Sequence, residues 1–395
     1  MTDTGTAPSA QHSHRFWHAR QRRGTGAPIA VLVLLAVVAG VVLGVEGAAH
    51  PVGLGIAVPL SALALSVVVS YFLWLDRWEP EPRRLLLLAF LWGATVAVIV
   101  SVVLELLTDE VLGDGVTLTV TGPFIEEAAK GAFLLVMLTG NRRREFDGVV
   151  DGLVYAGITA VGFAFIEDIG YIAQSFGQGT DTGVTTVVLR LVLAPFAHPL
   201  FTSLTGLGVG LAISRPRERL RWLYPVAGYL GAVGLHALWN GSLTFGLAGY
   251  LIVYVVVMVP AFGAAGLVAW RQRRRERDIV GQQLPQMVYY RWVSPAEAGW
   301  LASIGARRAW VRSVAERSGK DGVKALRGFQ LAATELAFLR DRVQRGVGPP
   351  NAYQLHEELV HALLVNRAAA VTAVPINPGA AAPVGPEPPA AARPR

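Results

Sequence analysis

The chain has 395 residues, of which 53% are hydrophobic and only 16% are charged. The charged fraction lies well below the roughly 25% that is usual for soluble domains, so the composition indicates a membrane protein. The chain contains no cysteine, which excludes disulfides, thiol catalysis, iron–sulfur clusters and cysteine-ligated zinc.

Apolar blocks follow a polar leader. The first 26 residues are predicted to be a disordered cytoplasmic N-terminus, and residues 27–270 to be the membrane domain. Each apolar block is close to the ~20 residues needed to cross a hydrocarbon core of ~30 Å. We therefore expect an all-α, polytopic membrane helix bundle of about eight spans. The expected spans are 28–48, 53–75, 85–107, 119–139, 149–173, 187–213, 222–244 and 249–270.

Arginines predict the orientation of these spans. Arginine clusters precede the first span and follow the second, fourth, sixth and eighth, whereas the connections at 47–51, 108–122, 175–183 and 245–249 contain no Lys or Arg. Basic residues mark the cytoplasmic side, so both termini are expected in the cytoplasm of a multi-pass cell-membrane protein. The net charge of +7 is then explained by topology and by anionic lipid, without a nucleic-acid partner.

A different pattern follows the last span. Residues 271–370 are predicted to form a small cytoplasmic unit of two or three helices, and 371–395 a disordered Ala/Pro-rich tail. Ser294 followed by Pro295 and Glu297 is typical of a helix start. The LHEELVH segment with His356 and His361 resembles a zinc-binding HExxH helix. Its two histidines are five residues apart, however, which places them about 140° apart around a helix, so we expect a surface or packing role.

The predicted spans contain polar residues that are expensive in a bilayer. A charged side chain at the centre of a span costs about 2.5–3.5 kcal/mol, so such residues are functional by default. Arg190 and Glu105 lie near the outer ends of their spans, Arg190 being expected as an interface anchor or counter-charge. The other residues of this kind are Glu126, Glu127, Lys130, Glu167, Asp168, His198, His236 and Asn240.

Depth within the bilayer tests whether these residues share a site. At a rise of ~1.5 Å per residue, Glu126, Glu127, His198 and His236 lie about 18–22 Å from the cytoplasmic boundary, and Glu167 about 27 Å. They are therefore expected in one layer of the outer half of the bilayer.

Local spacing adds detail to this layer. Lys130 can lie beside either glutamate of its helix, and His236 and Asn240 share a helix face. Pro195 and Pro199 flank His198 and are predicted to break the helix there. Gly162 is expected to permit close helix packing near Glu167.

Carboxylates and histidines without cysteine fit the activation of water, either on a metal or without one. With a metal, for which zinc is the candidate, Glu167, His198 and His236 would be the ligands, and Glu126 or Glu127 the general base. Without a metal, a buried glutamate would deprotonate water while His236 and Asn240 donate to the oxyanion. The sequence leaves both mechanisms open.

Four motifs give the chain a family resemblance. EExxK at 126–130, FxxxE at 163–167, His198 in FAHPLFTSLTG and HxxxN at 236–240 resemble the PrsW-type intramembrane proteases of the CAAX-protease and bacteriocin-processing superfamily. The resemblance covers about residues 55–270. It implies cleavage of a single-pass membrane protein, such as the first, extracytoplasmic cut of a membrane-bound anti-sigma factor. A proton-coupled transporter or channel, or a non-catalytic scaffold, is the alternative, and the oligomeric state is not predicted.

Overall fold

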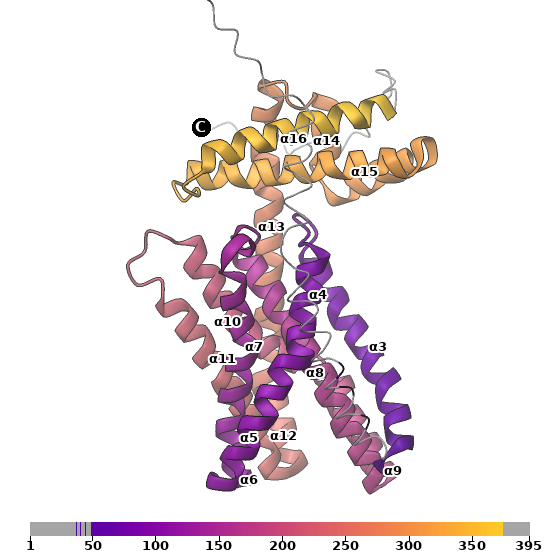
Figure 1. Cartoon of the computed structure of the whole chain (residues 1–395), viewed down its shortest axis with the longest axis vertical. Helices are drawn as coiled ribbons and strands as arrows, with labels where there is room; N and C mark the ends of the chain where they lie inside the picture. The colour runs from indigo at the N-terminus through magenta and orange to yellow at the C-terminus, as the bar shows by residue number, and fades with distance from the viewer. Residues whose placement is uncertain (1–36, 38–39, 41–43, 45–48, 374–395) are drawn as a thin grey trace, which may run out of the picture. The chain divides into compact units, whose positions relative to one another are not determined.

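The computed structural model of the chain describes residues 37, 40, 44 and 49–373. Every element in this part is a helix, which confirms the all-α prediction (Figure 1). The chain divides into two units, Met1–Gln272 and Arg273–Arg395. The leader at 1–26 and the tail beyond residue 373 lie outside the described residues, as does the expected first span at 28–48 apart from residues 37, 40 and 44.

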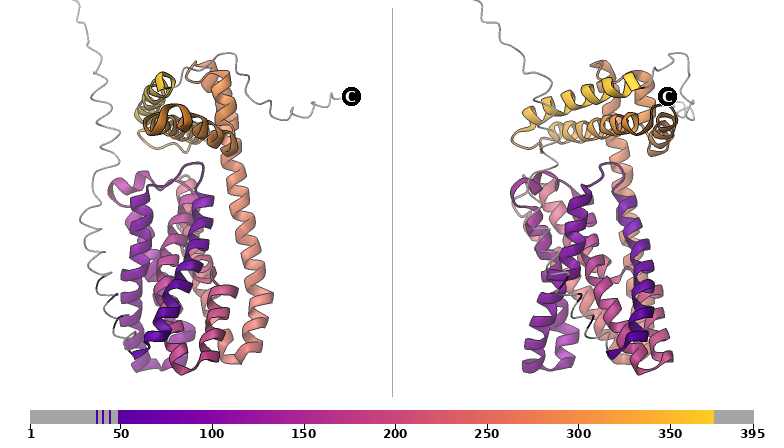
Figure 2. Two further views of the ribbon diagram at one scale, coloured as in Figure 1. Left: turned by 90° about the vertical axis from the view of Figure 1, so that its right-hand side faces the viewer. Right: turned by 45° about the vertical axis from the view of Figure 1, so that its right-hand side comes forward.

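The first unit is a bundle of helices, several of which contain a π-helical segment (Figure 2). Its α-helices are α3 Pro51–Leu75, α4 Arg83–Leu91, α5 Val98–Leu112, α6 Asp114–Val116, α7 Gly122–Met137, α8 Val149–Gln178, α9 Thr180–Val187, α10 Ala197–Ser214, α11 Leu223–Ser242, α12 Gly246–Val253 and the start of α13 Val259–Tyr289. Between them lie η1 Trp92–Ala97, η2 Thr117–Thr121, η3 Gly140–Arg144, η4 Val188–Leu193, η5 Leu243–Phe245 and η6 Tyr254–Met258.

Five of the described segments are long and apolar enough to cross a membrane. They are Pro51–Leu75, Arg83–Leu112, Val149–Gln178, Thr180–Ser214 and Leu223–Tyr289. The last of them contains both predicted spans 222–244 and 249–270, which are separated by η5. The predicted span 119–139 falls on the helical run that ends with α7 and that carries the EExxK motif.

Single glycines make three of the turns between these helices. Gly113 has φ 83°, Gly179 has φ 152° and Gly246 has φ 66°, and helix resumes immediately after each of them. Glycine lacks a Cβ and adopts such backbone angles without strain. The connections expected at 108–122 and 175–183 are therefore mostly helical.

The long helix α8 lies at the centre of the first unit and packs against α3, α4, α7 and α10. It approaches α10 through Gly152 and Gly206, where a Cβ on either residue would lie 2.1 Å from the carbonyl oxygen of the other. A Cβ on Gly162 would likewise lie 2.1 Å from the carbonyl oxygen of Phe90, so the close packing predicted there is confirmed. These backbone contacts fix α8, which carries Glu167, against α10, which carries His198.

The second unit contains the end of α13 together with α14 Pro295–Leu301, α15 Ile304–Gln344 and α16 Ala352–Ala373. The predicted helix start is confirmed, because the Glu297 N–H donates to Ser294 Oγ (3.2 Å) and the Ser294 N–H donates to Glu297 Oε2 (2.6 Å). His356 lies 5.4 Å from the ring of Trp292, which agrees with the packing role expected for it.

Candidate active site

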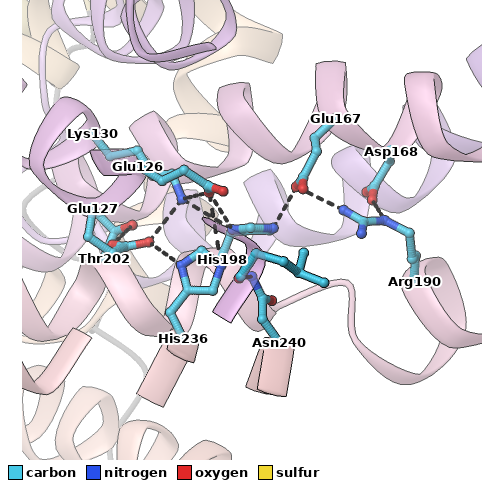
Figure 3. Close-up of polar contacts among 11 residues, drawn as sticks. Glu126, Glu127, Lys130, Glu167, Asp168, Arg190, His198, Thr202, His236 and Asn240 are labelled. Carbon is cyan, nitrogen blue, oxygen red and sulfur yellow. Dashed lines mark hydrogen bonds and ion pairs between the residues drawn. The ribbon is translucent and has the colours of Figure 1, made fainter. Parts of the chain in front are cut away.

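Four helices bring the polar residues of the membrane layer together (Figure 3). α7 carries Glu126, Glu127 and Lys130, while His198 and His236 come from α10 and α11. Glu127 and Lys130 are 0% exposed, and His236 is 1% exposed. Charges buried to this degree are costly unless they are paired. The contacts of each residue therefore decide what the site can do.

Lys130 is the centre of the ion pairs on α7. Its Nζ donates to Glu126 Oε2 and to Glu127 Oε1, each at 2.9 Å. These are the i,i+4 and i,i+3 pairs that the motif predicts. Lys130 Nζ also lies 3.2 Å from His198 Nδ1 and 4.0 Å from the centre of the Phe163 ring. The lysine thus links α7 to α8 and α10.

A break in the chain positions His198. Residues 194–196 are not helical, and α10 begins at Ala197, so His198 lies in its first turn. Pro199 costs no hydrogen bond there, because the first N–H groups of a helix have no partner within it. The break that the two prolines predict is confirmed.

The hydrogen-bond partners define the protonated nitrogen of each histidine. An ammonium group only donates, so the contact with Lys130 makes His198 Nδ1 an acceptor, and His198 Nε2 donates to Glu167 Oε2 at 2.6 Å. His236 Nδ1 lies 3.2 Å from Glu127 Oε1 and is the donor of that pair, because an ionised carboxylate only accepts. The two lone pairs, on His198 Nδ1 and His236 Nε2, both lie on the side of Glu126.

Glu126 completes a group of three with the histidines. Its Oε2 lies 3.9 Å from His198 Nδ1 and 3.9 Å from His236 Nε2. Within the described residues, this is the group of His, Asp and Glu side chains that could hold a metal ion, with its ligand atoms within 4.8 Å of one another. The set differs from the one expected from the sequence, because Glu126 takes the place of Glu167.

Glu167 contacts the site from the opposite side of His198. Arg190 Nη2 donates to Glu167 Oε2 at 2.8 Å, and Arg190 Nε donates to Asp168 Oδ1 at 2.6 Å. The guanidinium also lies 4.4 Å from the Tyr171 ring. Arg190 is therefore a counter-charge, one of the two roles expected for it, and it links Asp168 to Glu167.

Thr202 is a site residue that the sequence did not reveal. Its hydroxyl donates to Glu127 Oε2 at 2.7 Å, so both oxygens of Glu127 are engaged. Thr202 follows His198 by four residues and shares its helix face, which is the signal that could have found it. Hydroxyl residues are common in membrane helices, so this signal is weak on its own.

Asn240 does not join the network of glutamates, lysine and histidines. Its Nδ2 donates to the carbonyl oxygen of Leu118 in η2 at 3.1 Å. Asn240 follows His236 by one turn of α11, as predicted, but its amide binds the backbone of η2 and not the site residues. The oxyanion role expected for Asn240 therefore has no support from its contacts.

The charges of the site do not cancel. Counted as ionised, its four carboxylates carry −4 and its two cations carry +2, so the sum with neutral histidines is −2. A divalent cation would balance this sum. The residues counted are Glu126, Glu127, Glu167, Asp168, Lys130 and Arg190.

Comparisons with known proteins indicate which family the chain resembles. Residues 81–265, which contain every residue discussed above, match the model of the PrsW family of intramembrane metalloproteases. The chain is similar to the Protease PrsW of Geobacillus kaustophilus, with 28% identity over 178 residues, 45% of this chain and 74% of the relative. The Protease PrsW of Bacillus subtilis is 28% identical over 160 residues, 40% of this chain and 69% of the relative. That of Clostridioides difficile is 26% identical over 211 residues, 50% of this chain and 86% of the relative. No solved structure matches the chain.

Proposed function

We propose that the chain, whose residues 81–265 match the PrsW family of intramembrane metalloproteases, cleaves peptide bonds of single-pass membrane proteins, with Glu126, His198 and His236 as its active-site residues. It is a multi-pass membrane protein and a protease, so the transporter and scaffold alternatives are set aside. One observation carries the proposal: the lone pairs of two imidazoles lie beside one carboxylate oxygen. Because His198 Nδ1 accepts from Lys130, Glu126 Oε2 and His236 Nε2 remain to accept the two O–H groups of a bound water molecule.

We assign the proton transfer to Glu126. Among the described residues, Glu126 accepts one hydrogen bond, from Lys130, whereas Glu127 is engaged by Lys130, His236 and Thr202. A carboxylate with free acceptor capacity is the better general base. The water oxygen bonds to the carbonyl carbon of the peptide, Glu126 accepts the water proton, the C–N bond breaks, and the proton passes to the leaving nitrogen.

The remaining polar residues position the reacting ones. Glu127 accepts from His236 Nδ1 and Glu167 accepts from His198 Nε2, which holds both rings with their lone pairs towards Glu126. Pairs of this kind are typical of metal-binding histidines, whose second nitrogen donates to a carboxylate. Lys130 compensates the charge of both glutamates on α7.

The donor set fits a divalent metal, and we propose zinc. Glu126, His198 and His236 would hold it, since one carboxylate and two imidazoles are a common catalytic zinc set with an open position. The metal would take the place of Lys130 at His198 Nδ1, and Glu126 would then be a ligand, so the proton transfer assigned to Glu126 belongs to the mechanism without a metal. When bound, zinc acts as a Lewis acid and lowers the pKa of a coordinated water molecule. The negative sum of charges at the site supports a cation there.

We further propose the setting of the reaction. The depth of the site residues and the distribution of arginines support cleavage in the outer half of the cell membrane, with both termini in the cytoplasm. A membrane-bound anti-sigma factor is the substrate class suggested by the family resemblance. We also propose that the chain consists of a cytoplasmic N-terminus at 1–26, a protease domain at 27–270, a cytoplasmic helical region at 271–370 and a tail at 371–395.

Paired variants in proteoliposomes test these roles. Glu126→Gln is expected to lower the rate of cleavage of a single-pass substrate by about 100-fold or more, the usual contribution of a general base. His236→Ala is expected to lose both activity and metal, measured by elemental analysis of the purified protein. Normal cleavage by Glu126→Gln would overturn its assignment. Full activity in metal-free protein would remove the zinc and leave the glutamate mechanism.

A further inference from the structure

We propose that a polar face of α5 conducts water from the Gly113 turn to Glu126. This face, the α5 track, consists of Ser101, Glu105 and Asp109 on α5 together with Thr117 at the start of η2. Each contributes a buried atom that has no hydrogen-bond partner within the described part of the chain. These atoms are Ser101 Oγ, Glu105 Oε1, Asp109 Oδ1 and Thr117 Oγ1.

The spacing of the track places its members on one side of α5. Ser101, Glu105 and Asp109 follow each other at intervals of four residues and so share a helix face. The opposite side of α5 is apolar and exposed, with Val103 at 51% and Leu107 at 58%. Ser101 and Thr117, by contrast, are 2% and 8% exposed. The track therefore lies inside the bundle, while the apolar side of α5 suits lipid.

Contacts with the neighbouring segment show that the track leads to the active site. α5 packs against η2 and α7. Glu105 Oε1 lies 3.7 Å from the position that a Cβ would take on Gly122, and Gly122 is one helical turn before Glu126. α5 and the segment 117–126 run in opposite directions. Ser101, one turn before Glu105, is therefore level with Glu126, one turn after Gly122. Asp109, one turn after Glu105, is level with Thr117.

The energetics favour water along this line. A buried polar atom without a partner destabilises a fold. Ser101 Oγ and Glu105 Oε1 are such atoms, while the side chains of Asp109 and Thr117 lie close enough to interact with each other. Buried polar groups in proteins are regularly satisfied by ordered water molecules that make two to four hydrogen bonds. A row of hydroxyls and carboxylates along one face offers those bonds in sequence. Gly122 adds no side chain to the surface that faces Glu105, which leaves room beside the track.

The α5 track supplies the water that peptide hydrolysis consumes at the site. Hydrolysis uses one water molecule for each peptide bond, and hydrocarbon does not deliver water to buried residues such as Glu127 and His236. This role of the track rests on the function proposed for Glu126. Its hydration does not, because water along α5 can be detected in a protein that cleaves nothing.

Single cysteines test the hydration directly, since the chain has no cysteine of its own. Ser101→Cys and Thr117→Cys place thiols on the track, and Val103→Cys and Leu107→Cys are controls on the exposed apolar side of the same helix. Full-length protein in proteoliposomes is treated with a charged methanethiosulfonate reagent on both sides of the membrane. The track positions are expected to react at least about tenfold faster, because the reactive thiolate needs water to form.

Two outcomes separate this proposal from the protease mechanism. Equal and slow labelling at all four positions, in protein that still cleaves its substrate, would overturn the track. Fast labelling at Ser101→Cys and Thr117→Cys in protein that fails to cleave would support the track and count against the function assigned to Glu126. Ser101→Val, in an active preparation, is expected to lower kcat and leave KM unchanged, whereas unchanged kcat would contradict the delivery of water.

Discussion

Replacing Lys130 by methionine tests the charge balance on which the site depends. Lys130 and Glu127 are both 0% exposed, and the ammonium lies 2.9 Å from an oxygen of each glutamate on α7. At an effective dielectric constant of ~20, each pair is worth about 6 kcal/mol before desolvation is subtracted. Methionine retains the length and apolar contacts of the side chain.

The expected loss follows from the partners that remain. Removing one member of a buried pair leaves an uncompensated charge and costs about 3–5 kcal/mol. We therefore expect Lys130→Met to lower the free energy of unfolding by about that amount. The double variant Lys130→Met/Glu127→Gln should be less destabilised, because one of the two stranded carboxylates is then neutral.

Titration of the purified protein with SDS in mixed micelles, followed by tryptophan fluorescence, measures these differences. Arg215→Met is a matched control, because Arg215 forms an ion pair of 3.7 Å with Glu218 between side chains that are 45% and 48% exposed. Exposed pairs contribute about 0–1 kcal/mol. If Lys130→Met loses no more than Arg215→Met does, the buried pairs do not stabilise the bundle and our reasoning about the site fails.

Three further predictions concern residues around the site and in the connection before α4. Arg190→Leu should lower kcat more than Arg190→Lys does, because the lysine retains a positive charge beside Glu167; equal loss in both variants would indicate a structural role only. Thr202→Val removes one of the hydrogen bonds of Glu127 and is expected to cost about 1–3 kcal/mol of unfolding free energy, which the same SDS titration measures against Thr202→Ser. Burial raises the pKa of Asp76 from 3.8 to about 8, so its protonated form is favoured by folding. The contribution of Asp76 to the free energy of unfolding should be fully present below about pH 4 and be lost as the pH rises to about 8. Asp76→Asn should flatten this pH dependence in unfolding curves.

The membrane layer of the site could be predicted because the bilayer restricts it so strongly. Polar residues in an apolar span are few, and the helical rise converts their positions into depth with an error of about one turn. Glu126, Glu127, His198 and His236 were expected in one layer and lie in contact. The same counting could identify the helices because their length is set by the thickness of the membrane.

The partners within this layer could not be predicted, because they depend on rotation and tilt of the helices. Depth placed Glu167 about one turn away from His198, yet its carboxylate accepts from the imidazole at 2.6 Å. The non-helical residues 194–196 shift the start of α10, and counting along an unbroken helix misses that shift. For the same reason the sequence analysis expected Glu167 beside both histidines, where the structure has Glu126.

The pairing observed in the structure also explains where the missing positive charge belongs. Glu126 and Glu127 share Lys130, and Glu167 and Asp168 share Arg190, which leaves one unit of negative charge on each pair. Glu126 and Glu167 are the members of the two pairs that face His198. His198 lies between these two carboxylates, 3.9 Å from Glu126 through Nδ1 and 2.6 Å from Glu167 through Nε2. Since Lys130 donates to Nδ1, the imidazole itself is neutral and supplies no charge. A cation beside Glu126, His198 and His236 would balance both carboxylates at once, Glu126 directly and Glu167 through the ring of His198.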